Sequence, residues 1–192
     1  MAKTRFPPGT MLYPLPAALV TCAWGGACNV LTISWIGTVC TDPPMLSVSI
    51  RPERHSYEMV RQSGEFAVNL PGRDMARAVD FCGVNSGRDV DKFARLGLAT
   101  ERAAEISAPL LAACPVNLEC RVTEVKELGS HHMFLARVLA VWAEERLLNE
   151  KGLLRLGKAQ LLAYCHGQYR ALAEPLGSFG FSVRKKDGRR KS

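Results

Sequence analysis

The strongest constraint on the fold is the alternation of apolar and polar residues in the stretch 115–125. One set of side chains there is apolar and the other is polar, namely Val116, Leu118, Cys120 and Val122 against Asn117, Glu119, Arg121 and Thr123. Successive residues of a strand point to opposite faces, so this pattern predicts an antiparallel strand with one face on a core. The turn at Gly129-Ser130 leads into residues 133–143, which are apolar on both faces and are predicted to lie centrally in a sheet.

Other short strands are predicted between turns that contain Gly and Pro. The predicted strands are 17–24, 29–39, 45–51 and 65–70, and the predicted helices are 57–63, 74–82 and 91–96, with 158–173 partly helical. Several strands joined by short turns, with only short helices, predict a mainly β fold, an antiparallel barrel with helical additions. A doubly wound nucleotide-binding fold is disfavoured because the strands do not alternate with long helices and the Gly-x-Gly-x-x-Gly and Walker motifs are missing.

Length and charge limit the classes of function. A chain of 192 residues fits one domain, and its net charge of +7 is concentrated at one end. Residues 184–192 contain six basic residues and one acidic residue, which leaves +2 for the rest of the chain. A general nucleic-acid-binding surface is therefore not expected. The tail is predicted to be a solvated, disordered end, with electrostatic docking as the alternative.

The seven cysteines are an odd number without a Cys-x-x-Cys pair, and they predict reduced thiols in the cytoplasm. No secretory signal is recognised at Met1–Gly9, and no apolar run approaches the ~20 residues that cross a bilayer, so no membrane association is expected. Iron–sulfur ligation is a weaker alternative. Cys22 and Cys28, like Cys114 and Cys120, are six residues apart, unlike the common cluster spacings.

The stretch 46–56 combines a strand end, two arginines and several hydroxyl groups with a predicted helix start. Its alternation predicts a strand that ends at Pro52, which has no N–H to donate, and Ser56 is predicted to cap the helix that follows. Guanidinium groups, here Arg51 and Arg54, and the N–H groups of a helix start both bind phosphate oxygens. A phosphate site is therefore one interpretation, and a surface turn with solvated arginines is the other.

The neighbouring histidines His131 and His132 invite a metal interpretation that the pattern does not support. Neighbours on a strand point to opposite faces, so the pair cannot easily hold one ion. The remaining histidines, His55 and His166, do not supply a spaced ligand set. No metal site is therefore expected.

Several motifs together resemble the flavin reductase-like family. They are Asn29-Val30-Leu31-Thr32-Ile33-Ser34-Trp35, Asp42-Pro43-Pro44, Ser49-Ile50-Arg51-Pro52-Glu53-Arg54, Ser86-Gly87-Arg88-Asp89-Val90-Asp91-Lys92-Phe93 and Gly129-Ser130-His131-His132. The resemblance is closest to the flavoredoxin-type branch and covers residues 10–183. It implies one FMN-binding domain with a split β-barrel, Greek-key-like and antiparallel, which commonly forms a homodimer with the flavin near the interface.

The resemblance also implies which residues hold the cofactor. Backbone groups of residues 29–34, with Thr32 and Ser34, would line the isoalloxazine ring, and residues further along would hold the ribityl chain and phosphate. The cofactor-binding residues are predicted to be Asn29, Val30, Leu31, Thr32, Ser34, Ser49, Arg51, Arg54, Ser56, Ser86 and Lys92. His132 is the candidate for a histidine near the flavin. The alternatives are that Thr32 and Ser34 are plain barrel residues and that Lys92 is a solvated helix residue.

Because FMN carries the redox chemistry, the family resemblance implies an oxidoreductase without a dedicated acid–base pair. The expected activity is NAD(P)H-dependent flavin reduction. The alternative is a flavoredoxin-type carrier that exchanges electrons with a partner redox protein, and a third class is a non-catalytic FMN-binding or storage protein.

Overall fold

The structure, a computed structural model that describes residues 1–183, has a curled antiparallel sheet as its main element. Within these residues the seven-stranded sheet has the order β3-β2-β6-β9-β10-β5-β4. Each neighbouring pair in it is antiparallel. Its edge strands β3 and β4 do not pair with each other, so the barrel is split rather than closed.

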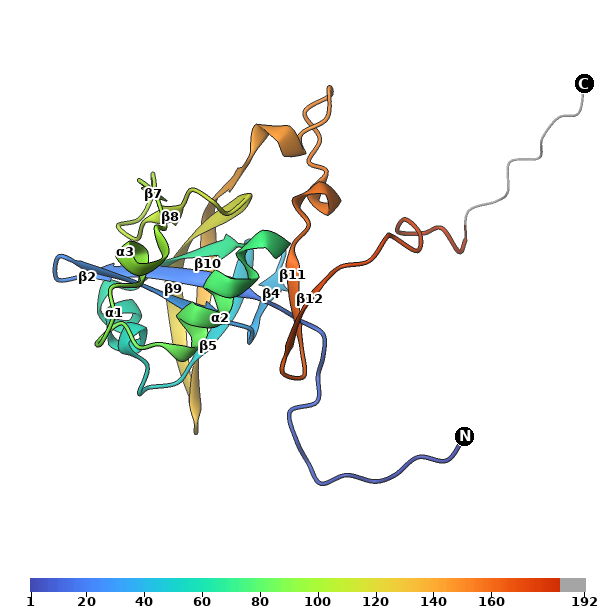
Figure 1. The fold of residues 1–192 in the computed structure, drawn as a ribbon, viewed down its shortest axis with the longest axis horizontal. Coiled ribbons are helices and arrows are strands. Elements are labelled where there is room, and N and C mark those ends of the chain that lie inside the picture. Colours follow the sequence, from blue (N-terminus) through green and yellow to red (C-terminus); the bar gives the residue numbers. More distant parts are fainter. Residues whose placement is uncertain (184–192) are drawn as a thin grey trace, which may run out of the picture.

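The order of elements along the chain is shown in Figure 1. The strands are β1 (Leu15–Pro16), β2 (Ala18–Trp24), β3 (Ala27–Ile33), β4 (Ile36–Cys40), β5 (Met45–Ile50), β6 (Glu65–Leu70), β7 (Thr100–Glu101), β8 (Leu110–Leu111), β9 (Val116–Leu128), β10 (His131–Ala143), β11 (Leu162–Cys165) and β12 (Gln168–Ala171). The α-helices are α1 (His55–Ser63), α2 (Ala76–Val84) and α3 (Lys92–Leu96), and the 3-10 helices are η1 (Arg73–Met75), η2 (Glu145–Leu147) and η3 (Leu156–Ala159).

The inside of the barrel forms one apolar core. Alternate residues of six strands point into it, among them Val20, Ile33, Val48, Phe66, Cys120 and Phe134. Helix α1 closes this core with Tyr57, Met59 and Val60. Gly64, in a left-handed conformation at φ 67°, ends α1 as the sequence predicts and lets β6 begin at once.

A second apolar layer covers the outer face of β2 and β3. Leu19 and Val30 point outward and pack with Val79 and Cys82 of α2, and β2 is therefore buried on both faces. The small sheet β1-β11-β12 also contributes to this layer through Leu162. This packing fixes α2 beside the end of β3, which is the arrangement that forms the cavities described below.

The structure confirms most of the predicted strands and corrects one of them. The predicted strand 29–39 is interrupted at Ser34-Trp35, because its first half pairs with β2 whereas its second half pairs with β5. The two halves thus belong to opposite ends of the sheet. The break leaves Ser34 and Trp35 at the mouth of a cavity instead of inside a ladder.

The segment 158–173 is also different from its prediction, since the partly helical interpretation holds only for its first residues. After η3 the chain forms the hairpin β11-β12, and β11 pairs with β1. The hairpin turn has two residues with positive φ, His166 at 46° and Gly167 at 85°. Pairing with β1, a contact distant in sequence, stabilises this hairpin over a local helix.

The predicted central position of residues 133–143 is confirmed, because β10 lies between β9 and β5. Helix predictions near 57–63, 74–82 and 91–96 correspond to α1, α2 and α3. The basic tail 184–192 lies outside the described residues, and its prediction stays a prediction.

Candidate functional site

Two adjoining cavities lie where the ends of β3 and β5 meet the start of α1 and the end of α2. Their volumes are about 350 and 360 Å³. The residues Leu31, Thr32, Arg51, Arg54 and Gly83 line both of them. The two therefore share a wall and are described together as one site, with a cationic half, called here the cationic cavity, and an aromatic half, called the aromatic cavity.

The cationic cavity gathers four basic side chains around one space. They are Arg51, Arg54, Arg88 and Lys92, and the acidic side chain lining the same cavity is Glu53. Hydroxyl and amide groups complete the lining at Asn29, Ser56, Asn85 and Ser86. The excess of positive charge suits a phosphate, because charge-assisted hydrogen bonds from guanidinium and ammonium groups bind its oxygens strongly.

The arginines are held in place by bonds that leave donors available. Arg54 Nη1 donates to the carbonyl of Gly83 at 3.1 Å, and Arg88 Nη1 donates to the carbonyl of Glu53 at 2.9 Å. Arg51 Nε pairs with the Glu53 carboxylate at 2.8 Å. A guanidinium has five N–H donors, so each arginine keeps several for a ligand. The contact between Arg54 and Gly83 also ties the start of α1 to α2.

Lys92 has a structural role as well as a place in the cavity lining. Its side chain is buried, and Nζ donates to the carbonyls of Val30 at 2.8 Å and Cys82 at 3.0 Å. Burial, together with nearby Arg54, lowers the pKa of Lys92. The ammonium thus joins β3 to α2 and has a third N–H. The alternative of a solvated helix lysine is wrong.

A second buried contact shapes the floor of the cationic cavity. The Asn29 amide donates to Ser56 Oγ at 2.7 Å, and both side chains are buried. Gly87 approaches Asn29 so closely that a Cβ at position 87 would overlap the Asn29 amide. The loop after α2 is therefore packed on β3. Ser56 lies inside α1, with Arg54 as the N-cap, so the prediction that Ser56 caps the helix is wrong.

The aromatic cavity is lined by two pairs of rings. Trp35 stacks on His131 with ring centroids 4.2 Å apart and an interplanar angle of 36°. From the β11-β12 hairpin, Tyr164 and Tyr169 lie 5.6 Å apart and also line the cavity. Ser34 and Ser49 supply hydroxyl groups between them. A flat, partly polar ring system suits such a lining, since aromatic rings pack on π surfaces at these separations.

The predicted cofactor residues converge on this site with one exception. All of them except Val30 line one or both cavities. The Val30 side chain packs in the outer apolar layer, and the residue contributes the carbonyl that Lys92 binds. Thr32 lines both cavities, but its hydroxyl donates to the carbonyl of Val79. In this structure that hydroxyl supports α2 and is not directed to a ligand.

The histidine that lines the site is the neighbour of the predicted one. His131, not His132, lines the aromatic cavity. His132 lies on the inner side, where its Nδ1 and the Tyr57 hydroxyl are 2.7 Å apart. The correction has a simple cause, because consecutive residues of β10 point to opposite faces of the sheet.

Sequence reasoning missed several lining residues. Arg88 and Gly87 fall within the motif 86–93, where only Ser86 and Lys92 had been predicted to contact a ligand. The extra basic residue in a loop beside a helix start was a usable signal. Tyr164 and Tyr169 also line the site, and no local pattern in the sequence links them to β3.

The positive charge of the site at neutral pH comes from its arginines and Lys92, and Glu53 and Asp80 are the acidic residues in its lining. Burial and nearby Arg88 and Lys92 lower the pKa of His55, and burial with Arg51 and Arg54 lowers that of His131. Both imidazoles are therefore mainly uncharged at pH 7. Burial raises the pKa of the Cys82 thiol in the cationic cavity to about 11, so it is not a thiolate.

Comparison with known proteins identifies the family. The family model "Flavin reductase like domain" matches residues 10–173, and the chain therefore belongs to the flavin reductase-like family. Flavoredoxin of Desulfovibrio vulgaris (Miyazaki F) has a similar structure, with a TM-score of 0.88 and 27% identity, covering 95% of this chain and 100% of that one. Flavoredoxin from Methanosarcina acetivorans gives a TM-score of 0.87 at 28% identity, covering 96% and 100%.

Sequence relatives include an enzyme component. The reductase component of a 4-nitrophenol 4-monooxygenase/4-nitrocatechol 2-monooxygenase from Rhodococcus opacus is 29% identical over 125 residues, 65% of this chain and 64% of that protein. An uncharacterized protein from Archaeoglobus fulgidus is 31% identical over 130 residues, 68% and 73% of the two chains. The predicted family and split β-barrel fold are thus confirmed.

Two further observations concern other classes of site. Across residues 1–183, no three His, Cys, Asp or Glu side chains gather in a way that could hold a metal ion. In the same part of the chain, no helix is long and apolar enough to span a membrane. All seven cysteines are free thiols.

Proposed function

We propose that this protein is an FMN-binding redox protein that reduces flavin with NAD(P)H. The observation that carries the proposal is that a cationic cavity and an aromatic one lie side by side and share five lining residues. One half suits a single phosphate and the other suits a tricyclic ring. Residues 10–183 would form the flavin-binding unit.

The residues of the site fit FMN group by group. Arg51, Arg54, Arg88 and Lys92 would hold the phosphate, and the N-terminal turn of α1 adds the positive end of a helix dipole. The hydroxyls of Ser49, Ser56 and Ser86 would bind the ribityl chain and phosphate. Backbone groups at the end of β3 would contact the polar edge of the ring.

FMN, when bound, supplies the capacity to accept and release electrons and hydride. The chain's own residues position it and control access. The cationic cavity fixes the phosphate end, and the Trp35–His131 stack and the two tyrosines bound the space left for a donor. The uncharged form of His131 at pH 7 keeps this half of the site free of further positive charge.

Two related proteins support the proposal that this protein carries out FMN-dependent redox chemistry. The FMN-binding protein from Thermus thermophilus, at 29% identity and a TM-score of 0.78, covers 93% of this chain and 97% of its own. The Rhodococcus relative is a reductase component. A reductase needs space for its nicotinamide donor beside the flavin ring, and the aromatic cavity would supply that space.

A flavoredoxin-type electron carrier is the second candidate. It is favoured by the likeness to two flavoredoxins over at least 95% of this chain. A carrier would exchange electrons with a partner redox protein and would not use NAD(P)H directly. The two candidates share the FMN site and differ in what approaches the aromatic cavity.

A spectroscopic experiment separates these candidates. The purified protein is loaded with FMN and titrated with NADH and with NADPH in the absence of oxygen, and the absorbance of oxidised flavin is followed. Rapid bleaching by either nucleotide supports the reductase. Inertness to both, with reduction by dithionite retained, would reject it and favour the carrier.

We further propose a homodimer located in the cytoplasm. Two large apolar side chains of β10 are exposed, Val141 and Trp142. They support the homodimer because a partner chain would remove this apolar surface from water. The free state of all seven thiols supports a reducing compartment. Light scattering of the FMN-loaded protein tests the dimer, since a mass near the 21.0 kDa of one chain would contradict it.

A further inference from the structure

The end of helix α2 contributes to the walls of both cavities of the candidate site. Cys82 lines the cationic cavity, Asp80 and Val84 line the aromatic cavity, and Gly83 lines both. The helix also packs closely on β3, since a Cβ at position 83 would lie 3.4 Å from the Thr32 Cβ. A helix end in this position can transmit the effect of a ligand in one cavity to the other.

The last carbonyls of α2 are bound by side chains from other elements. The final four carbonyls of a helix have no partner within the helix. Lys92 Nζ donates to the carbonyl of Cys82 at 3.0 Å, and Arg54 Nη1 donates to that of Gly83 at 3.1 Å. The last turn of α2 has no basic residue of its own. Two cations of the cationic cavity therefore hold the end of this helix, where the negative end of its dipole attracts them.

Lys92 has no acidic partner among residues 1–183. Its side chain is buried, its Nζ also donates to the carbonyl of Val30 at 2.8 Å, and none of the ion pairs in this part of the chain includes it. A buried ammonium is costly unless an anion compensates its charge. The cost is visible in the pKa of Lys92, which burial and nearby Arg54 both lower. The end of α2 is therefore held by a charge that an anion would stabilise.

Both cations can bind an anion and the helix at the same time. An ammonium has three N–H donors and a guanidinium has five. Lys92 therefore keeps one donor and Arg54 keeps several, and both side chains line the cationic cavity. An anion held there would neutralise the two charges without removing their bonds to α2. It would thus stabilise the helix end and, with it, one wall of the aromatic cavity.

We propose that an anion in the cationic cavity fixes the end of α2 and thereby raises the affinity of the aromatic cavity for a flavin ring. The two halves of the site are then thermodynamically coupled, and the ring raises the affinity for the anion by the same factor. Lys92 is in this way a positioning residue for the ring as well as a partner of the phosphate. The proposal rests on the flavin site proposed above.

Riboflavin and inorganic phosphate are the two parts of FMN, and their concentrations can be varied independently. The affinity of the flavin-free, full-length protein for riboflavin is measured by fluorescence titration at rising phosphate concentration. Sodium chloride at equal ionic strength is the control for screening. Phosphate is expected to raise the affinity for riboflavin about 5-fold or more, from the lower end of typical coupling between two sites. An unchanged or lower affinity in saturating phosphate would overturn the proposal.

Three variants separate an effect through α2 from an effect of charge alone. Lys92→Met keeps the length of the side chain and removes the ammonium, so it is expected to abolish the increase. Arg51→Ala removes a cation that lines the same cavities but pairs with Glu53 and not with α2, so the increase should remain at saturating phosphate. Lys126→Met, at an exposed lysine of β9 outside the site, should behave as the wild type. Loss of the increase in Arg51→Ala as well would reject the role of α2.

Hydrogen exchange gives a second measurement that does not depend on flavin. Phosphate alone should slow the exchange of the amides at the end of α2, residues 81–85, in the wild type and not in Lys92→Met. Equal exchange with and without phosphate in the wild type would contradict the proposed stabilisation of the helix end. Circular dichroism shows whether Lys92→Met is folded. Arg54→Ala, at an exposed residue, tests the other bond to α2 and is expected to reduce the increase in riboflavin affinity.

The outcomes separate this coupling from the flavin site itself. Binding of FMN with no effect of phosphate on the affinity for riboflavin rejects the coupling and keeps the site. Failure of both FMN and riboflavin to bind rejects both.

Discussion

Replacing Glu119 with glutamine is expected to destabilise the protein more than any surface change. Glu119 is a completely buried carboxylate on β9. Its Oε1 accepts bonds from Trp142 Nε1 at 2.6 Å and from the Ala104 N–H at 3.0 Å, and its Oε2 accepts from the Glu105 N–H at 2.6 Å. Together these bonds tie loop 102–107 to the sheet.

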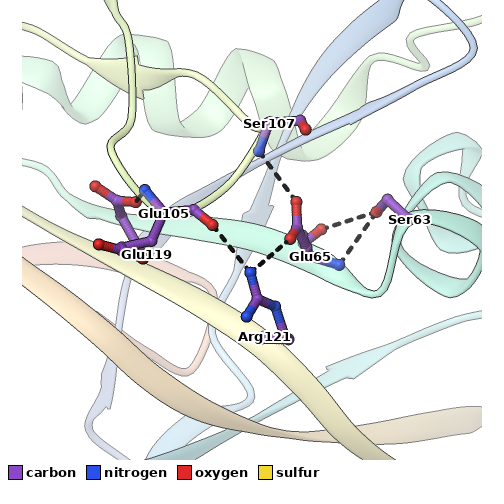
Figure 2. A network of polar contacts seen from close by, with 6 residues as sticks. All are labelled: Ser63, Glu65, Glu105, Ser107, Glu119 and Arg121. Carbon is purple, nitrogen blue, oxygen red and sulfur yellow. Dashed lines mark hydrogen bonds and ion pairs between the residues drawn. The ribbon is translucent and has the colours of Figure 1, made fainter.

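Figure 2 shows that a second carboxylate supports the same loop. Glu65 accepts from the Ser107 N–H at 3.0 Å and from Arg121 Nη2 at 3.1 Å, and Arg121 also donates to the carbonyl of Glu105 at 3.0 Å. The loop therefore depends on acceptors that its own sequence does not supply. Glu119 is the more critical of the two because it is completely buried, whereas the Glu65 side chain is partly exposed.

The size of the effect follows from these contacts. Glutamine has the same shape, but its amide N–H₂ would meet the N–H of Glu105 and one or two charge-assisted bonds would be lost. At about 1.5–3 kcal/mol for each bond, losing one or two should lower the free energy of unfolding by about 1.5–6 kcal/mol. For a domain of this size, that loss lowers Tm by roughly 3–24 °C.

The loss should also depend on pH. Burial alone would raise the pKa of Glu119, but the hydrogen bonds from the loop 102–107 and from Trp142 outweigh it. They lower this pKa below its ordinary value of 4.5. A depressed folded-state pKa gives stability that is present above the unfolded pKa and is lost as pH falls through the folded pKa. The difference between wild type and Glu119→Gln should thus be full at pH 7 and shrink below about pH 4.5.

Urea unfolding followed by circular dichroism at pH 7 and at acid pH measures both effects. Glu124→Gln is the matched control, since Glu124 lies on the same strand, is half exposed and pairs with Lys126 at 3.5 Å. That control should change stability by less than about 0.5 kcal/mol. Equal stability of Glu119→Gln and the control at pH 7 would show that the buried bonds of Glu119 do not stabilise the fold.

Three further predictions concern the site and the assembly. Arg51→Ala and Arg54→Ala should each weaken FMN binding by about 10- to 100-fold and riboflavin binding by less, because one phosphate contact is lost. Equal losses of affinity for both flavins in fluorescence titrations would show that these arginines do not contact the phosphate. Gly87→Ala should lower FMN affinity and Tm, since the new Cβ overlaps Asn29; an unchanged thermal melt would contradict the close packing of this loop. The FMN-loaded protein should scatter light as a dimer, twice the 21.0 kDa chain mass.

Local patterns predicted the strands well where one face meets the core. The alternation at 115–125 falls in β9 from Val116 onward, and the turn at Gly129-Ser130 is the β9-β10 hairpin turn. The prediction that only one face of this strand meets a core is wrong for its first half, because Asn117 and Glu119 of the polar face are buried too. Such signals work because side-chain direction in a strand has a period of two. The same period makes errors of one residue costly, and the choice between His131 and His132 could not be made without the register of β10.

The features that were missed depend on contacts between distant segments. The break at Ser34-Trp35 reflects pairing with two different strands, and neither partner is visible in the local sequence. Tyr164 and Tyr169 line the aromatic cavity because they belong to a hairpin that pairs with β1. Arg51 and Arg54 were predictable because they lie within ten residues of one strand end, whereas Arg88 lies in the loop after α2 and was not predicted. The hydrogen bond from Lys92 to the carbonyl of Val30 in β3 could be seen only in the folded structure.

The central claim is that the cationic cavity holds the single phosphate of FMN, and ligand selectivity tests it most directly. Calorimetric titration of flavin-free protein with FMN, riboflavin and FAD gives three dissociation constants under one condition. FMN is expected to bind at least about 10-fold more tightly than riboflavin, from one or more charge-assisted phosphate contacts. FAD is expected to bind more weakly than FMN. Equal affinity for FMN and riboflavin, or a preference for FAD, would contradict it.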